Sequence, residues 1–520
     1  DPHIRHGCKG PMAESAVHGS LIVGFLTMLL GFYFARRYLG NGPALFGAVS
    51  GAWLGSLAYY TMFLVSYGHT ASAFASGLLI FLWDRYRHAL TTQKWLLLGS
   101  ALGLAALMRC QNAFLVVLPF ATWLRVFFSS TRLRDWRHAL RHVANGVGFA
   151  VAAFLVFFPQ LLGWYQTTGN WLFVPQGEHF MRWTSPRIMG VLFSSGTGLF
   201  PGAPIIYVAI AGWGLLLMRK DLRSLGIAMF TLLALDTYVI ACAWDWWGAA
   251  GFPGRRFDAL TLPWMFGLAV VGSYVTRLNQ RHPNFGLALA ASLFVLMGGV
   301  WSWGIEQGLV RAMPTFMARS SNVQWKETFK HIVDPFWNVF GNPLTYPASL
   351  TVALRYGIHP KRWDVLGAQE FFYYDFESRA LQENTTILDF VDVQHRYYLT
   401  GSFQEEPARW KRTEVLVAAP GSARILLPIH TAQVRYFDFI VVPMDDGKSR
   451  TAPEMASPPT RLSLNVNGVS YGTKLLAPSG LQHVRFTLPH GAIHDRINEL
   501  WLYIQGDSLG FSQLHMQHGS

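Results

Sequence analysis

The sequence predicts an α-helical polytopic membrane protein that carries an all-β sandwich domain of the jelly-roll kind at its C-terminal end. The 520 residues are 51% hydrophobic, and the mean hydropathy is +0.25. Only 14% of the residues are charged, whereas soluble domains carry about 25%. After residue 412 the long apolar runs give way to short runs in which polar and apolar side chains alternate, which indicates strands.

Apolar runs of membrane-spanning length fill the first part of the chain, since a span takes roughly 20 residues. The ten candidates are 19–36, 43–62, 69–84, 94–108, 113–128, 143–163, 201–217, 224–243, 258–276 and 284–304. The connectors between them alternate in charge, with fourteen basic residues in one set and five in the other. Because basic connectors stay in the cytoplasm, the five lie outside, and so does the chain after residue 304.

This orientation also places residues 1–18 outside the membrane. A chain rarely starts on the translocated side without a translocated segment ahead of it, so we expect at least one further span upstream of residue 1. The expected parts are the outer segment 1–18, a transmembrane domain of about ten helices over 19–304, a mixed extracytoplasmic and interfacial region over 305–411, and a β-sandwich domain over 412–520.

Six short runs predict the strands of the C-terminal domain. They are "EVLVA", "ARILLPI", "VRYFDFIVV", "RLSLNVNG", "HVRFTLP" and "LWLYIQ". Asp446-Gly447 and Asn467-Gly468 are turn dipeptides between such runs. Short strands separated by turns in this way are typical of a small antiparallel sandwich.

Polar chemistry gathers in three outer segments: "RCQN" at 109–112, the loop 164–200, and "AWDWWGAAGFPGRRFDAL" at 243–260. Arginine grips phosphate with a planar fork, and tryptophan stacks on the apolar faces of sugar rings. We therefore expect these segments to hold an anionic lipid headgroup. The candidate binding residues are Arg109, Gln111, Asn112, Gln176, Glu178, Arg182, Trp246, Trp247, Arg255 and Arg256.

Two carboxylates lie among these arginines, and two interpretations of them stay open. Asp245 and Asp258 are candidates for a general base that acts on an acceptor hydroxyl. They are equally candidates for structural counter-ions of Arg255 and Arg256. For most of the tryptophans the better interpretation is an interfacial belt.

Composition also argues against nucleic-acid-binding, disulfide-rich and zinc-binding proteins. The basic residues fall in short connectors and form no soluble patch, so nucleic acid is not an expected partner. The three cysteines are too scattered for a disulfide framework or a zinc site. The sequence identifies no metal ligands and leaves dependence on a divalent metal open.

Four stretches carry a resemblance to a known family: "YGHTASAFASGLLIFLW", "LGLAALMRCQNAFLVVLP", "VLFSSGTGLFPGAPIIYVAIAGWGLLL" and "DWWGAAGFPGRRFDALTLP". Over roughly residues 10–305 the chain resembles the GT-C superfamily of polytopic glycosyltransferases, in particular bacterial family-39-like membrane proteins. The run "VFGNPLTYPASLTVALRYGI" at 339–358 looks shared with some members. The β-rich tail is similar to carbohydrate-binding sandwiches appended to such proteins.

The resemblance implies a function and a location. It implies a sugar donor linked to polyprenyl phosphate, a glycan or protein acceptor on the outer face, and a substrate-binding role for Arg109, Arg255 and Arg256. It also implies a multi-pass protein of the bacterial plasma membrane with its C-terminal domain in the periplasm. Protein partners would bind through the β domain.

One feature departs from the family pattern. The catalytic acid of the superfamily usually follows the first span, but the outer stretch "DPHIRHGCKGPMAES" offers only Asp1 and Glu14. Either the acid lies upstream or the chain is a non-catalytic accessory subunit whose β domain binds proteins or glycans. A transporter is disfavoured, because the charges lie at the outer face and no internal repeat is evident.

Overall fold

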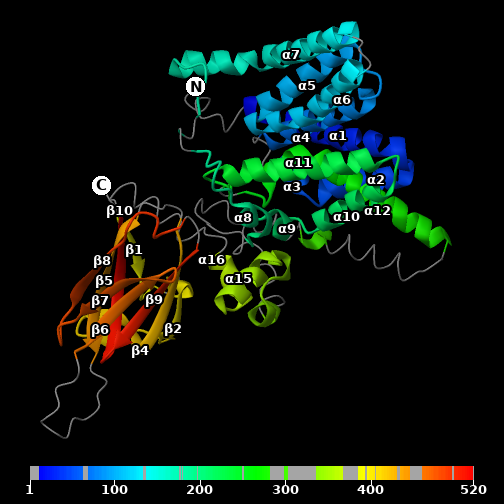
Figure 1. Ribbon diagram of the computed structural model, residues 1–520. Helices are drawn as coiled ribbons and strands as arrows, with labels where there is room; N and C mark the ends of the chain where they lie inside the picture. Colours follow the sequence, from blue (N-terminus) through cyan, green and yellow to red (C-terminus); the bar gives the residue numbers. More distant parts are fainter. Residues whose placement is uncertain are drawn as a thin grey trace, which may run out of the picture. The chain divides into compact units, whose positions relative to one another are not determined.

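The computed structural model describes residues 11–62, 68–132, 136–174, 177, 180–195, 197–248, 251–281, 298–301, 335–366, 385–392, 395–404, 406–429, 434–444, 459–494 and 497–518. The chain divides into two compact units, Asp1–Tyr346 and Pro347–Ser520. The first unit is built of helices, and the second is mainly strands (Figure 1).

The first unit follows the apolar runs of the sequence. Its elements are α1 (Pro11–Leu39), α2 (Asn41–Trp53), α3 (Ser56–Met62), α4 (His69–Tyr86), α5 (Thr92–Met108), η2 (Cys110–Val116), α6 (Val117–Arg132), α7 (Trp136–Thr168), α8 (Ile188–Phe193), α9 (Leu199–Gly202), α10 (Ile205–Met218), α11 (Arg223–Cys242), η3 (Arg255–Leu260), α12 (Thr261–Arg281) and η4 (Pro343–Thr345).

Five segments of the described chain are long and apolar enough to cross a membrane. They are Val17–Leu39, Cys110–Ser129, Ala139–Thr168, Arg223–Cys242 and Arg255–Arg281. These helices fit a membrane protein and confirm the coarse prediction of an apolar helical domain. The expected run 43–62 is divided between α2 and α3, and most of the run 284–304 lies outside the described residues. The count of ten spans stays a prediction.

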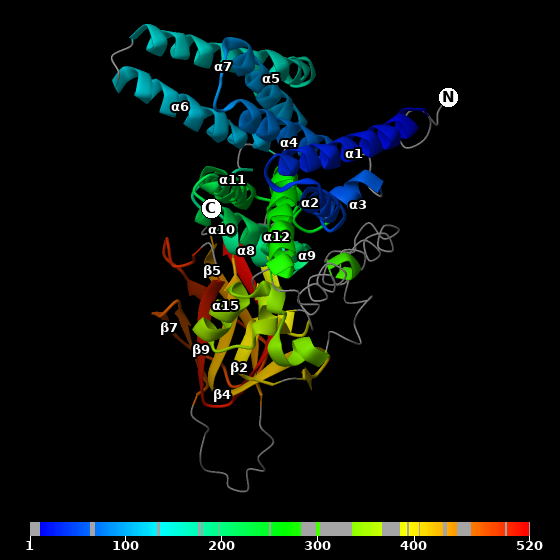
Figure 2. The ribbon, with the colours of Figure 1, turned by 90° about the vertical axis from the view of Figure 1, so that its right-hand side faces the viewer.

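Small residues let the helices approach one another closely around α12. A Cβ added at Gly47 of α2 would collide with the backbone of Met265, and one added at Gly212 of α10 would collide with the backbone of Gly267. Figure 2 shows α12 between these two helices. Close packing at small residues replaces the hydrophobic driving force that membrane helices lack.

The far ends of α1 and α4 are joined by a buried carboxylate. Asp84 is 1% exposed and accepts hydrogen bonds from Arg37 at 2.5 Å and from Tyr38 at 2.8 Å. Arg87 lies 3.3 Å from the same carboxylate and also donates to Ser224 of α11. These contacts join the C-terminal ends of α1 and α4 to the N-terminal end of α11. The charge pattern predicts that all three ends lie on the cytoplasmic side.

The second unit begins with α15 (Ala348–Tyr356), η5 (Pro360–Arg362) and α16 (Trp363–Leu366). Its other elements are β1 (Thr385–Asp389), η6 (His395–Tyr398), β2 (Leu399–Phe403), β3 (Ala408–Trp410), β4 (Thr413–Pro428), β5 (Val434–Met444), β6 (Arg461–Val466), β7 (Val469–Leu475), β8 (Gln482–Thr487), β9 (Ile497–Gln505) and β10 (Ser508–His518).

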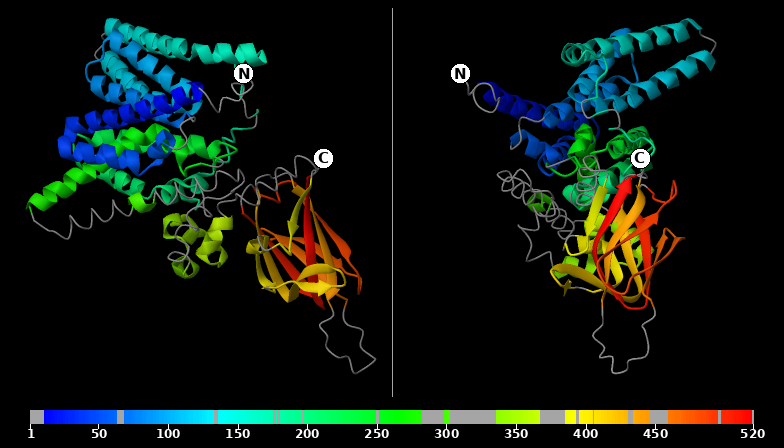
Figure 3. Two further views of the ribbon diagram at one scale, coloured as in Figure 1. Left: turned by 180° about the vertical axis from the view of Figure 1, so that it is seen from behind. Right: turned by 90° about the vertical axis from the view of Figure 1, so that its left-hand side faces the viewer.

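These strands form one antiparallel sheet in the order β7-β6-β9-β4-β10-β5-β8, with β1 on β10 and both β2 and β3 on β4. Figure 3 shows the sheet curled around its buried face. Alternation along β9 places Leu500, Leu502 and Ile504 in that core, because successive side chains point to opposite faces. An antiparallel β unit is thereby confirmed, while the two-layer sandwich form stays a prediction.

Local signals account well for this unit. All six predicted runs overlap strands, and three of them extend one or two residues past the strand end. The runs "EVLVA" and "ARILLPI" belong to the single long β4. Asn467 and Gly468 both have positive φ between β6 and β7, so the predicted Asn-Gly turn is confirmed. Asp446-Gly447 lies outside the described residues. Three strands, β1 to β3, precede residue 412.

Candidate functional site

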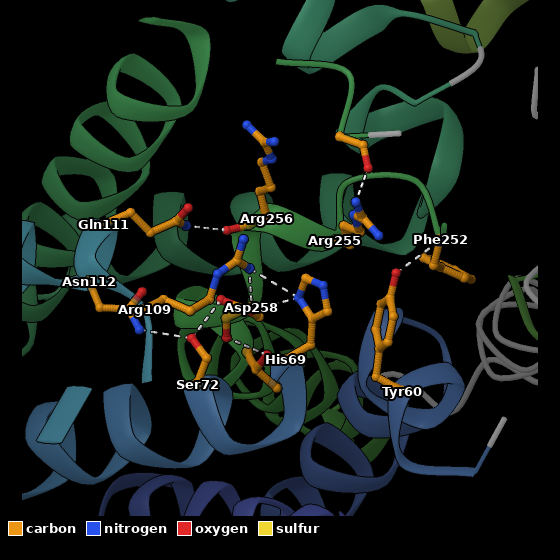
Figure 4. A network of polar contacts seen from close by, with 12 residues as sticks. Tyr60, His69, Ser72, Arg109, Gln111, Asn112, Phe252, Arg255, Arg256 and Asp258 are labelled. Carbon is orange, nitrogen blue, oxygen red and sulfur yellow. Dashed lines mark hydrogen bonds and ion pairs between the residues drawn. The ribbon is translucent and has the colours of Figure 1, made fainter. Parts of the chain in front are cut away.

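A buried charged network surrounds Asp258, which is 2% exposed. Its carboxylate lies 2.7 Å from Nη1 of Arg109 and 2.8 Å from Nδ1 of His69, and it accepts a hydrogen bond from Ser72 at 3.0 Å. Figure 4 shows these side chains converging from α4, from the end of α5 and from η3. We call His69, Ser72, Arg109 and Asp258 the Asp258 network.

The two amides of the "RCQN" segment extend the contacts. Asn112 donates to Ser72 at 2.8 Å and to the carbonyl of Ala105 at 3.0 Å. Gln111 donates to the backbone carbonyl of Arg256 at 2.8 Å. Arg109 and Gln111 therefore connect the start of η2 to η3, and Asn112 connects η2 to α4 and α5. Burial lowers the pKa of Arg109, but the neighbouring Asp258 carboxylate raises it by more, so the net pKa lies above its ordinary value.

A second carboxylate lies close to this network. Asp236 of α11 is fully buried, and neither of its oxygens accepts a hydrogen bond from the described residues. The sequence interpretation passed over Asp236 because it lies within a span. An ionisable side chain inside a membrane helix is by default a candidate functional group.

The arginine pair lies on the other side of η3, in a small cavity. Its lining includes Thr197, Trp246, Trp247, Arg255, Arg256 and Phe257, and it is partly open to solvent. Arg256 lies 2.6 Å from Asp245, and the two side chains are 14% and 27% exposed. Arg255 donates to the carbonyl of Gly248. We call this the arginine cavity.

Asp245 and Asp258 therefore have different surroundings. Asp258 pairs with Arg109, and Asp245 pairs with Arg256, so one of the two structural pairings considered from the sequence is present. The Oδ1 atom of Asp245 is buried and accepts no hydrogen bond within the described chain. Of the two carboxylates, Asp245 is the one with acceptor capacity left for a ligand.

Glycines shape the turn that carries the arginine pair. Gly248 and Gly254 have φ of 74° and 66°, a conformation that favours glycine. A Cβ at Gly251 would lie 2.6 Å from Nη1 of Arg255 and 2.8 Å from the hydroxyl of Tyr60. That hydroxyl in turn accepts a hydrogen bond from the backbone N–H of Phe252 at 3.1 Å. The glycines thus allow the positive φ angles of this turn, and the one at 251 leaves room for the side chain of Arg255.

The loop before α8 packs along this turn. Met181 and Ala243 form a β-bridge, and the backbone N–H of Arg182 donates to the carbonyl of Cys242 at 2.6 Å. Trp246 and Trp247 are 4% and 9% exposed and contact each other edge to face at 6.0 Å. These two tryptophans are buried parts of the site rather than a lipid-facing belt. Gln176 and Glu178 lie outside the described residues.

An apolar groove adjoins the arginine cavity. It is lined by α2, α9, α10 and α12 residues that include Gly51, Leu199, Ala203, Ile206, Ala209 and Leu268. Gly254 and Phe257 line both the groove and the cavity. A polar head bound beside the arginines would therefore have an apolar surface next to it.

Sequence reasoning missed His69, Ser72, Asp236 and Thr197. His69 and Ser72 are three residues apart and so share one face of a helix, a signal that was available in the apolar run "YGHTASAF". Asp236 stands alone in its run, and Thr197 has no distinguishing pattern. Across the described residues no group of three or more His, Cys, Asp or Glu side chains is placed to hold a metal ion.

No relative of known function assigns a role to these residues. No family model matches the chain, and a search of curated proteins gives no match either.

Proposed function

We propose that the first unit is a GT-C-like membrane glycosyltransferase that takes a sugar from a polyprenyl-phosphate carrier and transfers it to an acceptor on the outer face. One observation carries the proposal: a cavity lined by two arginines and two tryptophans adjoins an apolar groove within a set of membrane-length helices. An anionic head joined to a long apolar chain matches that combination.

Each side chain then has a chemical role in the proposal. Arg255 and Arg256 hold the phosphate, which is the leaving group when the sugar–oxygen bond breaks. Trp246 and Trp247 supply the walls beside the sugar. Asp245 is the general base that accepts the proton of the acceptor hydroxyl, since its Oδ1 accepts no hydrogen bond from described residues. Asp258 positions Arg109 and His69. The lipid-linked sugar is the donor substrate.

The proposal includes a location. The site and the second unit face the extracytoplasmic side, as the charge pattern of the connectors indicates, and the resemblance implies that the membrane is a bacterial plasma membrane. The second unit binds glycan or protein there. A reporter fused after residue 248 or after residue 518 tests this orientation, and a cytoplasmic signal at either position would contradict it.

A transfer assay tests the activity. The protein expressed from its complete gene is reconstituted in lipid nanodiscs with radiolabelled undecaprenyl-phosphate hexoses and a membrane extract as the source of acceptor. We expect transfer by the wild type and a loss of about a hundredfold in Arg255→Ala and Arg256→Ala, since each removes a charge-assisted contact to phosphate. Arg187→Ala is the matched control on the same face and should transfer normally. Unchanged transfer in both cavity variants would remove these arginines from the site.

A second candidate is an accessory subunit without catalytic activity. Its supporting observation is that Arg109 and Arg256 are each already paired with a carboxylate, as structural ion pairs would be. Absence of transfer by the wild type with every donor, together with co-purification of a partner through the second unit, would favour this candidate.

A further inference from the structure

Two hydrogen-bond donors in the arginine cavity have no partner among the residues that the structure describes. The Nε1 atom of Trp246 and the Oγ1 atom of Thr197 are buried, and neither forms a hydrogen bond within the described residues. Both residues line the cavity together with Arg255 and Arg256. Because more than nine in ten buried polar groups in proteins have a partner, these two donors are available to a ligand or a water in the cavity.

The protein holds both side chains in place before any ligand arrives. The six-membered ring of Trp246 packs against Gly190, where an added Cβ would lie 2.7 Å from Cη2. The backbone N–H of Trp246 donates to the carbonyl of Ala243 at 3.1 Å. Thr197 is fixed through its own carbonyl, which accepts a hydrogen bond from the N–H of Gly254 at 3.0 Å.

The donors restrict the chemistry of the ligand. An indole N–H can only donate, so the atom that meets Trp246 must be an acceptor. The guanidinium groups of Arg255 and Arg256 in the same cavity select acceptors that carry negative charge. A phosphodiester presents two non-bridging oxygens that share one negative charge, so each oxygen can accept a hydrogen bond from one of the two neutral donors.

We propose that Trp246 Nε1 and Thr197 Oγ1 donate hydrogen bonds to the two non-bridging oxygens of the phosphate of a lipid-linked sugar, an assignment that rests on the proposed function. The adjoining apolar groove, which shares Gly254 and Phe257 with the cavity, receives the start of the lipid chain. Trp246 and Thr197 thereby become determinants of headgroup specificity in addition to the arginine pair.

Binding of tritiated undecaprenyl-phosphate hexoses, which are phosphodiesters, to the full chain in phosphatidylcholine nanodiscs tests the assignment. Trp246→Phe and Thr197→Val remove one donor each with little change in shape, and each should weaken binding about tenfold or more. Thr197→Ser keeps the hydroxyl and should bind like the wild type. Trp171→Phe and Thr276→Val are matched controls, because Trp171 is 48% exposed and Thr276 donates within its own helix.

The possible outcomes distinguish a failure of the donor assignment from a failure of the proposed function. Wild-type binding with equal binding by Trp246→Phe and Thr197→Val would overturn the donor assignment and leave the proposed function intact. No binding by the wild type would overturn the proposed function itself. Equal competition by phosphatidylglycerol would show a general phospholipid site, which contradicts the carrier but supports the two donors. Normal thermal unfolding of each variant excludes misfolding as the cause.

Discussion

The Asp258 network and the arginine cavity use the same kinds of residue for different ends. In the network, Arg109, His69 and Ser72 all direct polar atoms at one carboxylate that is 2% exposed. In the cavity, Arg256 and Asp245 pair at 2.6 Å with side chains 14% and 27% exposed, and two neighbouring donors form no hydrogen bond within the described part of the chain. The difference teaches that hydrogen-bond saturation, more than residue type, separates a structural ion pair from a binding site.

Removal of the central carboxylate should have the largest effect. Asp258→Ala leaves Arg109 and His69 buried without their common partner, which costs about 3–5 kcal/mol for a broken buried pair. We expect poor insertion or a strongly lowered unfolding temperature in detergent. Asp258→Asn keeps hydrogen bonds but loses the charge, so its loss should be smaller. If the Asp258→Ala variant were as stable as the wild type, the Asp258 network would not be a structural element distinct from the arginine cavity.

Replacement of Arg256 by lysine should act on binding more than on folding. Lysine keeps the charge next to Asp245 but lacks the planar fork, so affinity for undecaprenyl phosphate should fall about tenfold, near 1.4 kcal/mol. The unfolding temperature should stay close to that of the wild type. If it falls as far as in Asp258→Ala, the cavity is part of the structural core.

The position of the Trp246 ring can be changed by a substitution at Gly190, which packs against that ring. Gly190→Ala places a Cβ 2.7 Å from the ring, and overpacking of this kind costs about 1–3 kcal/mol. Weaker binding should accompany the lost stability. Gly163→Ala is the control, because nothing lies within 4 Å of its added Cβ and alanine favours a helix. Undiminished binding by Gly190→Ala would show that the position of Trp246 does not govern the site.

The smallest effect is expected for an exposed ion pair. Arg219 and Asp221 lie 2.7 Å apart with side chains 40% and 62% exposed, and exposed pairs contribute little. The hydrogen bond from Arg219 lowers the pKa of Asp221 below its ordinary 3.8. The slight stabilisation is therefore present above pH 4 and is lost as the pH falls below this range. Asp221→Asn should unfold like the wild type at neutral pH, and a clear shift would contradict this ranking.

Local patterns predicted most of the fold. Hydropathy located the helices, and period-2 alternation with the Asn467-Gly468 turn located the strands, because both signals depend on neighbouring residues. The segments of the site were also predicted, since arginines on the expected outer face stood out against the charge rule. Arg255 and Arg256 are the first two residues of η3, and Arg109 contacts Asp258 of the same short helix.

The partners of those arginines were not predictable from local pattern. Arg109 meets Asp258 across 149 positions of sequence, and nothing in either segment specifies the other. His69 and Ser72 were hidden in an apolar run, where a single polar residue is more often a satisfied core group than part of a site. Thr197 is identified only by its cavity and by the absence of a partner among the described residues, both of which are properties of three-dimensional packing.

The long sequence separation within the Asp258 network bears on biosynthesis. A ribosome delivers Arg109 well before Asp258, at roughly 5–20 residues per second, so for some seconds the guanidinium has no permanent counter-ion. A nascent chain stalled before residue 258 should then be recognised as incomplete by membrane quality control, whereas one stalled shortly after it should already resist degradation.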